Sequence, residues 1–158
     1  MKTLIIYASY HHGNTEKIAL AMAKVLGADT MKYLDFQKEE INKYEAIGIG
    51  SGIYGGKVKK DLAAMVDSIN WENKNVFVFS TSGMGKIEYN KPMVSLLEKK
   101  KAKIIGSFAC KGFDTFAIFK LFGGVAKGHP DAEDIKNAQD FARGLNKWPG
   151  KTIFETAR

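Results

Sequence analysis

Residues 5–17 decide the fold of this chain, and their sequence is Ile5-Ile6-Tyr7-Ala8-Ser9-Tyr10-His11-His12-Gly13-Asn14-Thr15-Glu16-Lys17. The apolar run from Leu4 to Ile6 is typical of a buried strand. After the polar turn, apolar residues recur at helical spacing, at Ile18, Met22, Val25 and Leu26. The pattern therefore predicts a strand, then a turn, then a helix that begins directly after the turn. Such a turn aims backbone N–H groups and the positive end of the helix dipole at one point, which suits a phosphate. The alternative is a helix-capping loop without a ligand.

The composition indicates one globular domain. The chain has 158 residues, 45% of them hydrophobic, and no apolar run approaches the roughly 20 residues that span a bilayer. The sequence shows no signal-peptide pattern, and with Cys110 as its one cysteine it can form no internal disulfide. We therefore expect a cytoplasmic protein.

The formal net charge is +7, which raises the question of a nucleic-acid partner. The lysines are spread along the chain, and the one dense run, residues 98–103, ends a predicted helix, where cations are favoured. We therefore expect no nucleic-acid binding. The positive surplus favours an acidic protein partner or an anionic cofactor through long-range attraction.

Strands and helices alternate along the sequence. The periodicity predicts strands at Lys2–Ala8, Thr30–Leu34, Ala46–Ser51, Asn75–Ser80 and Lys103–Cys110. It predicts helices at Asn14–Leu26, Lys59–Ile69, Tyr89–Lys101 and Asp131–Leu145. This order indicates an α/β fold with a mostly parallel sheet that helices cover on both faces.

Loops that follow parallel strands meet at one edge of the sheet, and four of them here are polar, glycine-rich or aromatic. They are Ser9–Thr15, Ser51–Gly56, Ser80–Gly85 and the segment that begins at Gly112. Residues 50–55 match the glycine spacing of dinucleotide-binding loops, but no acidic residue ends the next strand, as that motif requires. We therefore interpret this loop as one that presents the Tyr54 ring.

In three loops, in this order, the sequence resembles the flavodoxin family. The matching residues are Tyr7-x-Ser9 with Gly13-Asn14-Thr15, then Gly50-Ser51-Gly52-Ile53-Tyr54-Gly55, then Phe79-Ser80-Thr81-Ser82-Gly83. The resemblance covers Met1–Asn146. It implies a flavodoxin-like three-layer sandwich with a five-stranded parallel sheet of order 2-1-3-4-5 and FMN at the strand ends. We expect one domain, residues 1–146, with the tail 147–158 packed on it.

The resemblance also implies site residues. The phosphate would be held by Ser9, Gly13, Asn14 and Thr15. The ring would lie against Tyr54, flanked by Gly52, Ile53 and Gly55, and beside the third loop, Thr81, Ser82, Gly83, Met84 and Gly85. Phe113, Phe116 or Met84 would cover its second face.

One departure from the family concerns the first loop. Tyr10 stands where the family commonly has serine or threonine, and the loop is one residue longer. His11 and His12 thereby become candidate phosphate or ribityl contacts. Because adjacent histidines point to different sides and no other ligand type lies at suitable spacing, we expect no metal site there.

We expect an electron carrier between redox proteins, with acidic partners and no catalytic side chain. The alternative is an FMN-dependent NAD(P)H:quinone-type oxidoreductase, and a third possibility is a non-redox binding domain. The segment Lys111–His129 either packs as an apolar cluster or short helix through Phe116–Phe122, or covers a ligand. The sequence leaves the oligomeric state open.

Overall fold

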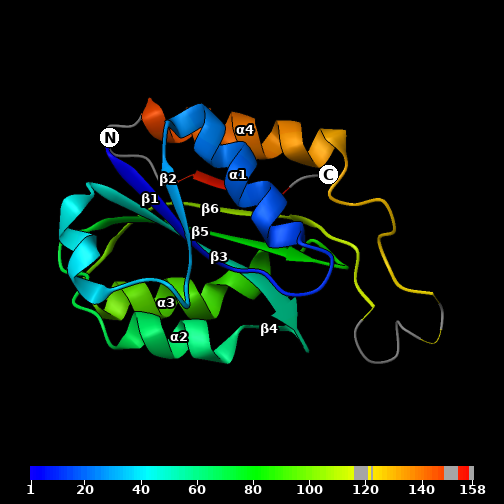
Figure 1. Cartoon of the computed structure of the whole chain (residues 1–158), viewed down its shortest axis with the longest axis horizontal. Helices are drawn as coiled ribbons and strands as arrows, with labels where there is room; N and C mark the ends of the chain where they lie inside the picture. Colours follow the sequence, from blue (N-terminus) through cyan, green and yellow to red (C-terminus); the bar gives the residue numbers. More distant parts are fainter. Residues whose placement is uncertain (116–120, 122, 148–152, 157–158) are drawn as a thin grey trace.

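A central parallel sheet organises the molecule (Figure 1). The computed structural model describes residues 1–115, 121, 123–147 and 153–156. The sheet has the strand order β2-β1-β3-β5-β6-β7, and each neighbouring pair on this path is parallel. Its strands are β1 (Thr3–Ala8), β2 (Asp29–Lys32), β3 (Ala46–Tyr54), β5 (Asn75–Ser82), β6 (Lys103–Lys111) and β7 (Ile153–Thr156). The short strand β4 (Lys57–Val58) pairs antiparallel with the end of β3.

Helices cover both faces of the sheet, as Figure 1 shows. One layer holds α1 (Asn14–Leu26) and α4 (Ala132–Asn146), and the other holds α2 (Lys60–Asp67) and α3 (Lys91–Lys99). Two 3-10 turns lie in the connections between these elements: Lys38–Lys43 between β2 and β3, and Ile87–Asn90 between β5 and α3. No helix among the described residues is both long and apolar enough to cross a membrane.

The two cores follow from the alternation of side chains along the strands. On β1, Ile5 and Tyr7 pack under α1 and α4, while Leu4 and Ile6 pack over α2 and α3. Among the described residues the first core also holds the rings of Phe77, Phe79, Phe108 and Phe141, and the second holds Trp71.

The predicted α/β fold and its parallel strand order are confirmed, because the five predicted strands correspond to β2-β1-β3-β5-β6. The predicted count of five strands is too low, since β7 extends the sheet beyond β6 and β4 was not predicted. Two predicted helices are also too long: Lys59 is the N-cap of α2, and Tyr89 belongs to the 3-10 turn before α3.

The second predicted loop, residues 51–56, is in fact a β-hairpin. Strand β3 continues through Tyr54, and the chain turns at Gly55 and Gly56, whose φ angles are +57° and +78°. A two-residue turn with positive φ at both positions matches the twist of the paired strands, and glycine adopts it without steric cost. The hairpin holds Tyr54 at the rim of the sheet edge where the strands end.

Two glycines of β3 make room for aromatic rings of the neighbouring strand. A Cβ atom at Gly48 would lie 2.4 Å from Cζ of Phe77, and one at Gly50 would lie 2.1 Å from Cζ of Phe79. Both rings are at most 1% exposed. The glycine spacing in this strand therefore serves the packing of the first core.

The segment between β6 and α4 leaves the sheet at the edge where the strands end (Figure 1). Its two ends are tied together: Asp114 and Val125 form an antiparallel bridge, and the backbone N–H of Phe113 donates to the carbonyl of His129. Residues 116–120 and 122, where the predicted helix or cluster would lie, are outside the described residues.

Candidate functional site

A cavity of about 430 Å³ lies at the carboxyl ends of β1, β3, β5 and β6. Four separate parts of the chain form its wall. Its lining residues are Tyr10, His11, His12, Asn14 and Thr15 from the first loop, Gly52, Ile53 and Tyr54 from β3, Thr81 and Ser82 from β5, and Gly112, Phe113, Asp114 and Thr115 after β6. The volume lies within the range of about 300–1,000 Å³ that is usual for small-ligand sites.

The first loop has an unusual backbone. His11, His12 and Gly13 are consecutive residues with positive φ, at 47°, 50° and 66°. Histidine is among the few non-glycine residues enriched in this region, but each such residue still costs free energy. The three residues form a tight turn in which the N–H of Gly13 donates to the carbonyl of His11 at 2.5 Å. This turn leads directly into α1, which presents the positive end of its dipole there.

The first loop and the segment after β6 are bonded to each other across the cavity. Nδ2 of Asn14 donates to the carbonyl oxygen of Phe113 at 2.8 Å. Nε2 of His12 lies 3.2 Å from Oγ1 of Thr115, and its ring is centred 4.5 Å from that of Phe113. These contacts fix the separation of two walls of the cavity.

The side-chain oxygen of Asn14 is the clearest sign of a ligand. Oδ1 is buried and has no hydrogen-bond partner among the described residues, while Nδ2 of the same amide donates to the carbonyl oxygen of Phe113. A buried polar atom without a partner costs about 1–3 kcal/mol. A hydroxyl or N–H group of a bound molecule would satisfy this oxygen.

Tyrosines form the opposite rim. The rings of Tyr10 and Tyr54 meet edge to face at 6.3 Å, and the Tyr10 hydroxyl lies 2.7 Å from that of Tyr33. The ammonium of Lys59 lies over the Tyr10 ring, 4.7 Å from its centre. Burial raises the pKa of Tyr54, and the hydrogen bond with Tyr10 is the main cause that raises the pKa of Tyr33 to about 12. Both phenols are therefore neutral near pH 7.

The floor joins α1 to β5. Thr15 and Thr81 are both buried, and their hydroxyl oxygens lie 2.9 Å apart. Beyond β5, Oγ of Ser82 accepts from the N–H of Gly85, which folds the turn 83–85 back on itself. This turn lies beside the segment after β6, because a Cβ atom at Gly83 would be 3.3 Å from Cβ of Asp114.

The structure brings ten of the sixteen predicted site residues together along the cavity wall, and the other six lie elsewhere. Oγ of Ser9 accepts from the N–H of Glu16 and so supports the first turn of α1. Gly13 is the N-cap of α1, and Gly55 belongs to the hairpin turn. Gly83, Met84 and Gly85 form the turn beyond Ser82, with the Met84 side chain 52% exposed.

Four lining residues were not among the predicted site residues: Tyr10, Gly112, Asp114 and Thr115. Tyr10 replaces a small hydroxyl residue of the family. A signal for Gly112 existed, because it begins the fourth loop predicted at this edge of the sheet. A Cβ atom there would lie 2.9 Å from Nδ2 of Asn14, so glycine permits the approach of the two walls.

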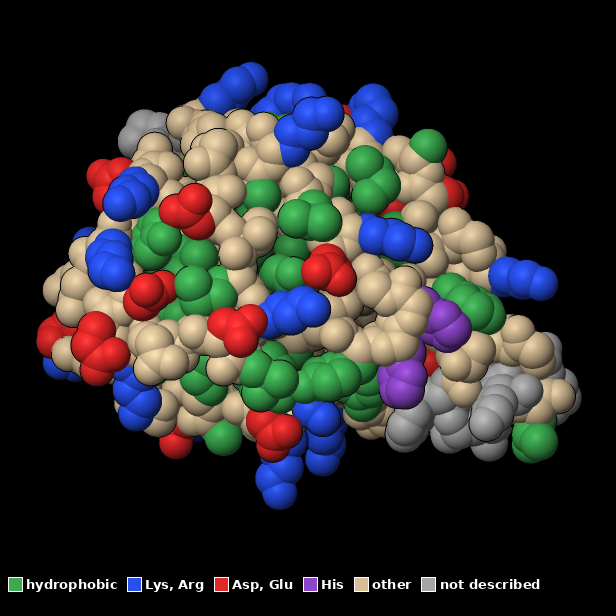
Figure 2. Space-filling model, in the orientation of Figure 1, with side chains coloured by type: hydrophobic (Ala, Val, Ile, Leu, Met, Phe, Trp, Pro, Cys, Tyr) green, Lys and Arg blue, Asp and Glu red, His purple; other side chains and the backbone are tan. Residues whose placement is uncertain are grey.

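The cavity wall carries little fixed charge. Among the described lining residues there is no lysine or arginine; the acidic residue is Asp114, and the groups able to become cationic are His11 and His12. Elsewhere the lysines are spread over the surface, with carboxylates between many of them, as Figure 2 shows for one face.

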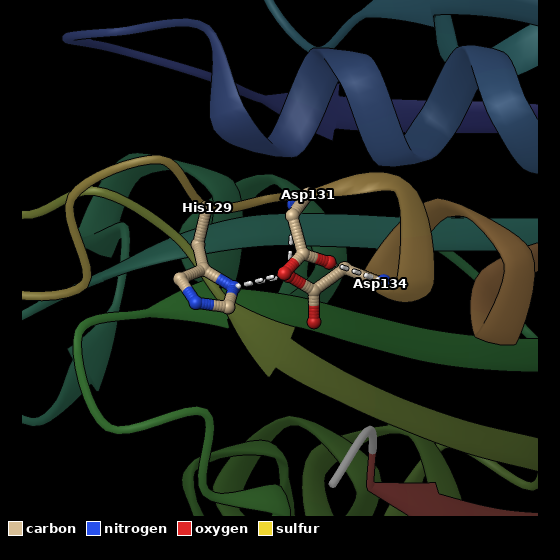
Figure 3. A group of neighbouring side chains, drawn as sticks. All are labelled: His129, Asp131 and Asp134. Carbon is tan, nitrogen blue, oxygen red and sulfur yellow. Dashed lines mark hydrogen bonds and ion pairs between the residues drawn. The ribbon is translucent and has the colours of Figure 1, made fainter.

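A second cluster, shown in Figure 3, anchors the segment after β6 to α4. Nδ1 of His129 lies 2.5 Å from Oδ2 of Asp134 and 3.6 Å from Oδ2 of Asp131. Asp131 and Asp134 form a capping box, in which each carboxylate accepts from the backbone N–H of the other residue. Pro130 directly precedes this N-cap. Although these three side chains are close enough to hold a metal ion, their mutual bonds account for the arrangement.

The cap gives a pH-dependent contribution to stability. The N–H of Asp134 is the main cause that lowers the pKa of Asp131. A carboxyl whose pKa is lowered by folding stabilises the fold above its unfolded pKa, and this contribution is lost as the pH falls through the folded pKa. In the variant Asp131→Asn, which retains a good N-cap but does not titrate, we expect the melting temperature to fall less between about pH 5 and pH 3 than in the wild type. Parallel thermal melts across that range test this, and equal slopes would contradict it.

Comparisons with known proteins agree with this architecture. The sequence profile of the family described as flavodoxin domain matches residues 4–117. An uncharacterised protein of Methanocaldococcus jannaschii is 45% identical over 149 residues, which cover 93% of this chain and 99% of that protein. Oxidised flavodoxin 1 from Bacillus cereus superposes with a TM-score of 0.68 at 18% identity, over 95% of this chain and 100% of that one. A Fusobacterium nucleatum flavodoxin bound to flavin mononucleotide gives 0.64 at 16% identity, over 93% and 98%.

Proposed function

Because the chain belongs to the flavodoxin domain family, we propose that it carries electrons between redox proteins with FMN held at the carboxyl edge of its sheet. FMN is the cofactor that this family membership supports. The cavity itself supports this placement, because there the start of α1 meets a partnerless amide oxygen and an aromatic rim.

The residues of the cavity fit FMN by their chemistry. The start of α1, with its backbone N–H groups and the positive end of its dipole, suits the phosphate. The partnerless Oδ1 of Asn14 and the hydroxyls of the floor suit the ribityl hydroxyl groups. The rings of Tyr54 and Phe113 offer apolar faces to the flavin ring, and the end of β5 offers backbone groups to its polar edge.

Bound FMN supplies the redox chemistry, since it accepts and returns electrons. The protein's part is to bind the cofactor, to fix its ring and to limit the access of water. The ties from Asn14 and His12 to the segment after β6 hold both walls in place before the cofactor arrives. Neutral phenols at Tyr54 and Tyr33 keep the rim free of negative charge near pH 7.

A carrier needs a surface on which a partner docks close to the ring. The hairpin beside Tyr54 carries Lys57, and the start of α2 carries Lys59 and Lys60; Lys57 and Lys60 are exposed. Their charge supports an acidic redox partner through electrostatic steering. With its one free and buried cysteine, Cys110, the chain also suits the reducing cytoplasm, where we propose that it works.

Titration of the cofactor-free protein with FMN tests the proposal. We expect one-to-one binding that quenches the yellow fluorescence of the flavin, and riboflavin should bind more weakly because it lacks the phosphate. Absence of binding in calorimetry, with excess FMN and correctly folded protein, would overturn the proposal.

A second measurement separates the carrier from the reductase that the sequence also allowed. The FMN-loaded protein is mixed with NADH or NADPH without oxygen, and the flavin absorbance is followed. A carrier keeps its yellow colour over minutes and loses it only with a strong chemical reductant. Rapid bleaching by either nucleotide would show a reductase instead.

A further inference from the structure

The cavity wall has to hold an anionic phosphate, yet its fixed charge is negative. The one acidic residue among its described lining is Asp114, and that lining includes no lysine or arginine. Backbone N–H groups and a helix dipole offer partial charges only. A side chain that becomes cationic would therefore add most to the binding of a dianion.

The groups that can become cationic are the adjacent residues His11 and His12. Both line the cavity, and both are exposed enough to meet an incoming ligand. Both stand in the tight turn directly before Gly13, the N-cap of α1, and both have positive φ angles. His12 is held in position by Thr115 and by the Phe113 ring, which links its imidazole to the opposite wall.

Histidine is the residue whose ordinary pKa lies closest to neutrality. The phosphate of a monoester carries nearly two negative charges at pH 7. When such a dianion approaches an imidazole, it favours the protonated form, so binding draws a proton from solution. A neutral ligand of the same shape draws none.

Resting on the proposed function, we infer that His11 and His12 supply the positive charge of the phosphate site, so that FMN binding takes up about one proton and riboflavin binding takes up none. The pair then makes the protein select the phosphorylated cofactor, and it makes cofactor affinity fall as the pH rises above neutrality. This is a binding equilibrium: one proton moves from solution to an imidazole, and no covalent bond of the cofactor is made or broken.

Other titratable groups surround the histidines, and none of their types changes charge near pH 7 under ordinary conditions. Glu16 and Lys17 lie in the first turn of α1, and the Glu16 carboxylate accepts from the Tyr7 hydroxyl. The others among the described residues are Asp114 and Lys111 from the end of β6 and its following segment, Tyr54 from the hairpin, Lys59 at the start of α2, and Tyr10 from the loop itself. Of these protein groups the histidines alone account for proton uptake near neutral pH, and the double variant separates their uptake from protonation of the phosphate, whose second pKa is about 6.

Calorimetry in two buffers of different ionisation enthalpy measures the proton directly. At about pH 7.5 we expect wild-type protein to take up close to one proton with FMN and close to none with riboflavin. FMN affinity should fall by up to about tenfold per pH unit above neutrality, as uptake of one proton requires. The variants His11→Asn and His12→Asn, alone and together, keep a residue type that tolerates positive φ. The double variant should lose the proton uptake and the pH dependence while binding riboflavin as the wild type does.

Two control variants exclude trivial causes. Lys24→Gln removes one positive charge at the far end of α1, and His129→Gln removes the histidine of the α4 cap. Both should keep the proton uptake. FMN binding without proton uptake, or with the same pH profile in the double variant, would overturn the inference and leave the proposed function standing. If neither FMN nor riboflavin binds folded protein at any pH, the proposed function itself fails.

Discussion

Replacement of Asn14 by aspartate is expected to weaken FMN binding by about a hundredfold or more while the fold stays intact. The carboxylate would face the cofactor phosphate from the first turn of α1, and a like-charge contact of this kind costs several kcal/mol. A hundredfold loss corresponds to about 2.7 kcal/mol. Without cofactor, the loss of the bond to Phe113 and the gain from a negative charge at a helix start roughly cancel, so stability should change by less than about 1 kcal/mol.

The matched control is Asn14→Ala. It removes the same hydrogen bond and the same amide oxygen but adds no charge, and we expect it to weaken FMN binding by about tenfold. Riboflavin, which lacks the phosphate, should bind Asn14→Asp at least as tightly as Asn14→Ala, because the carboxylate keeps an acceptor for the ribityl hydroxyl groups. Fluorescence titrations with both flavins measure these affinities, and equal FMN affinity in the two variants would place the phosphate away from Asn14.

Replacement of Gly50 by alanine is expected to destabilise the protein by about 3 kcal/mol, the upper part of the usual range for overpacked cores. The new methyl group would lie 2.1 Å from Cζ of Phe79, whose fully buried ring has no room to move outward. For a domain of this size, the melting temperature should fall by about 6–12 °C. Thermal and denaturant unfolding measure the change.

A double-mutant cycle identifies the cause. Phe79→Leu replaces the ring that blocks the methyl group with a smaller side chain. The double variant should therefore be more stable, by at least about 1 kcal/mol, than the sum of the two single losses of stability predicts. Additive effects would show that the cost arises from the backbone of β3 and not from the contact with Phe79.

The fold could be predicted from the sequence where a regular hydrophobic pattern continues over many residues. The run Leu4–Ile6 and the helical spacing of Ile18 and Met22 were sufficient for β1, α1 and the turn between them. The hairpin was missed because the glycines at positions 52, 55 and 56 were taken as loop residues. The Gly55-Gly56 pair between Tyr54 and Lys57 is in fact a usual hairpin signal, and it was available in the sequence.

The site was predicted less completely because one wall comes from a segment without periodicity. Thr115 meets His12 of the first loop across a sequence separation of 103 residues, and no local pattern predicts such a contact. The role of Gly50 could not be read from the glycine spacing either. That spacing resembles a nucleotide loop, whereas here its cause is the ring of Phe79 on the next strand.

The bonds that join Asn14 and His12 to Phe113 and Thr115 also bear on how the protein is made. During synthesis, β1, the first loop and α1 leave the ribosome long before the residues that close the cavity. The nascent chain therefore has no complete cavity until translation has passed Thr115 and β6 has docked beside β5. Cofactor capture thus comes late in biogenesis, and a chain that holds its flavin has already assembled the whole sheet edge.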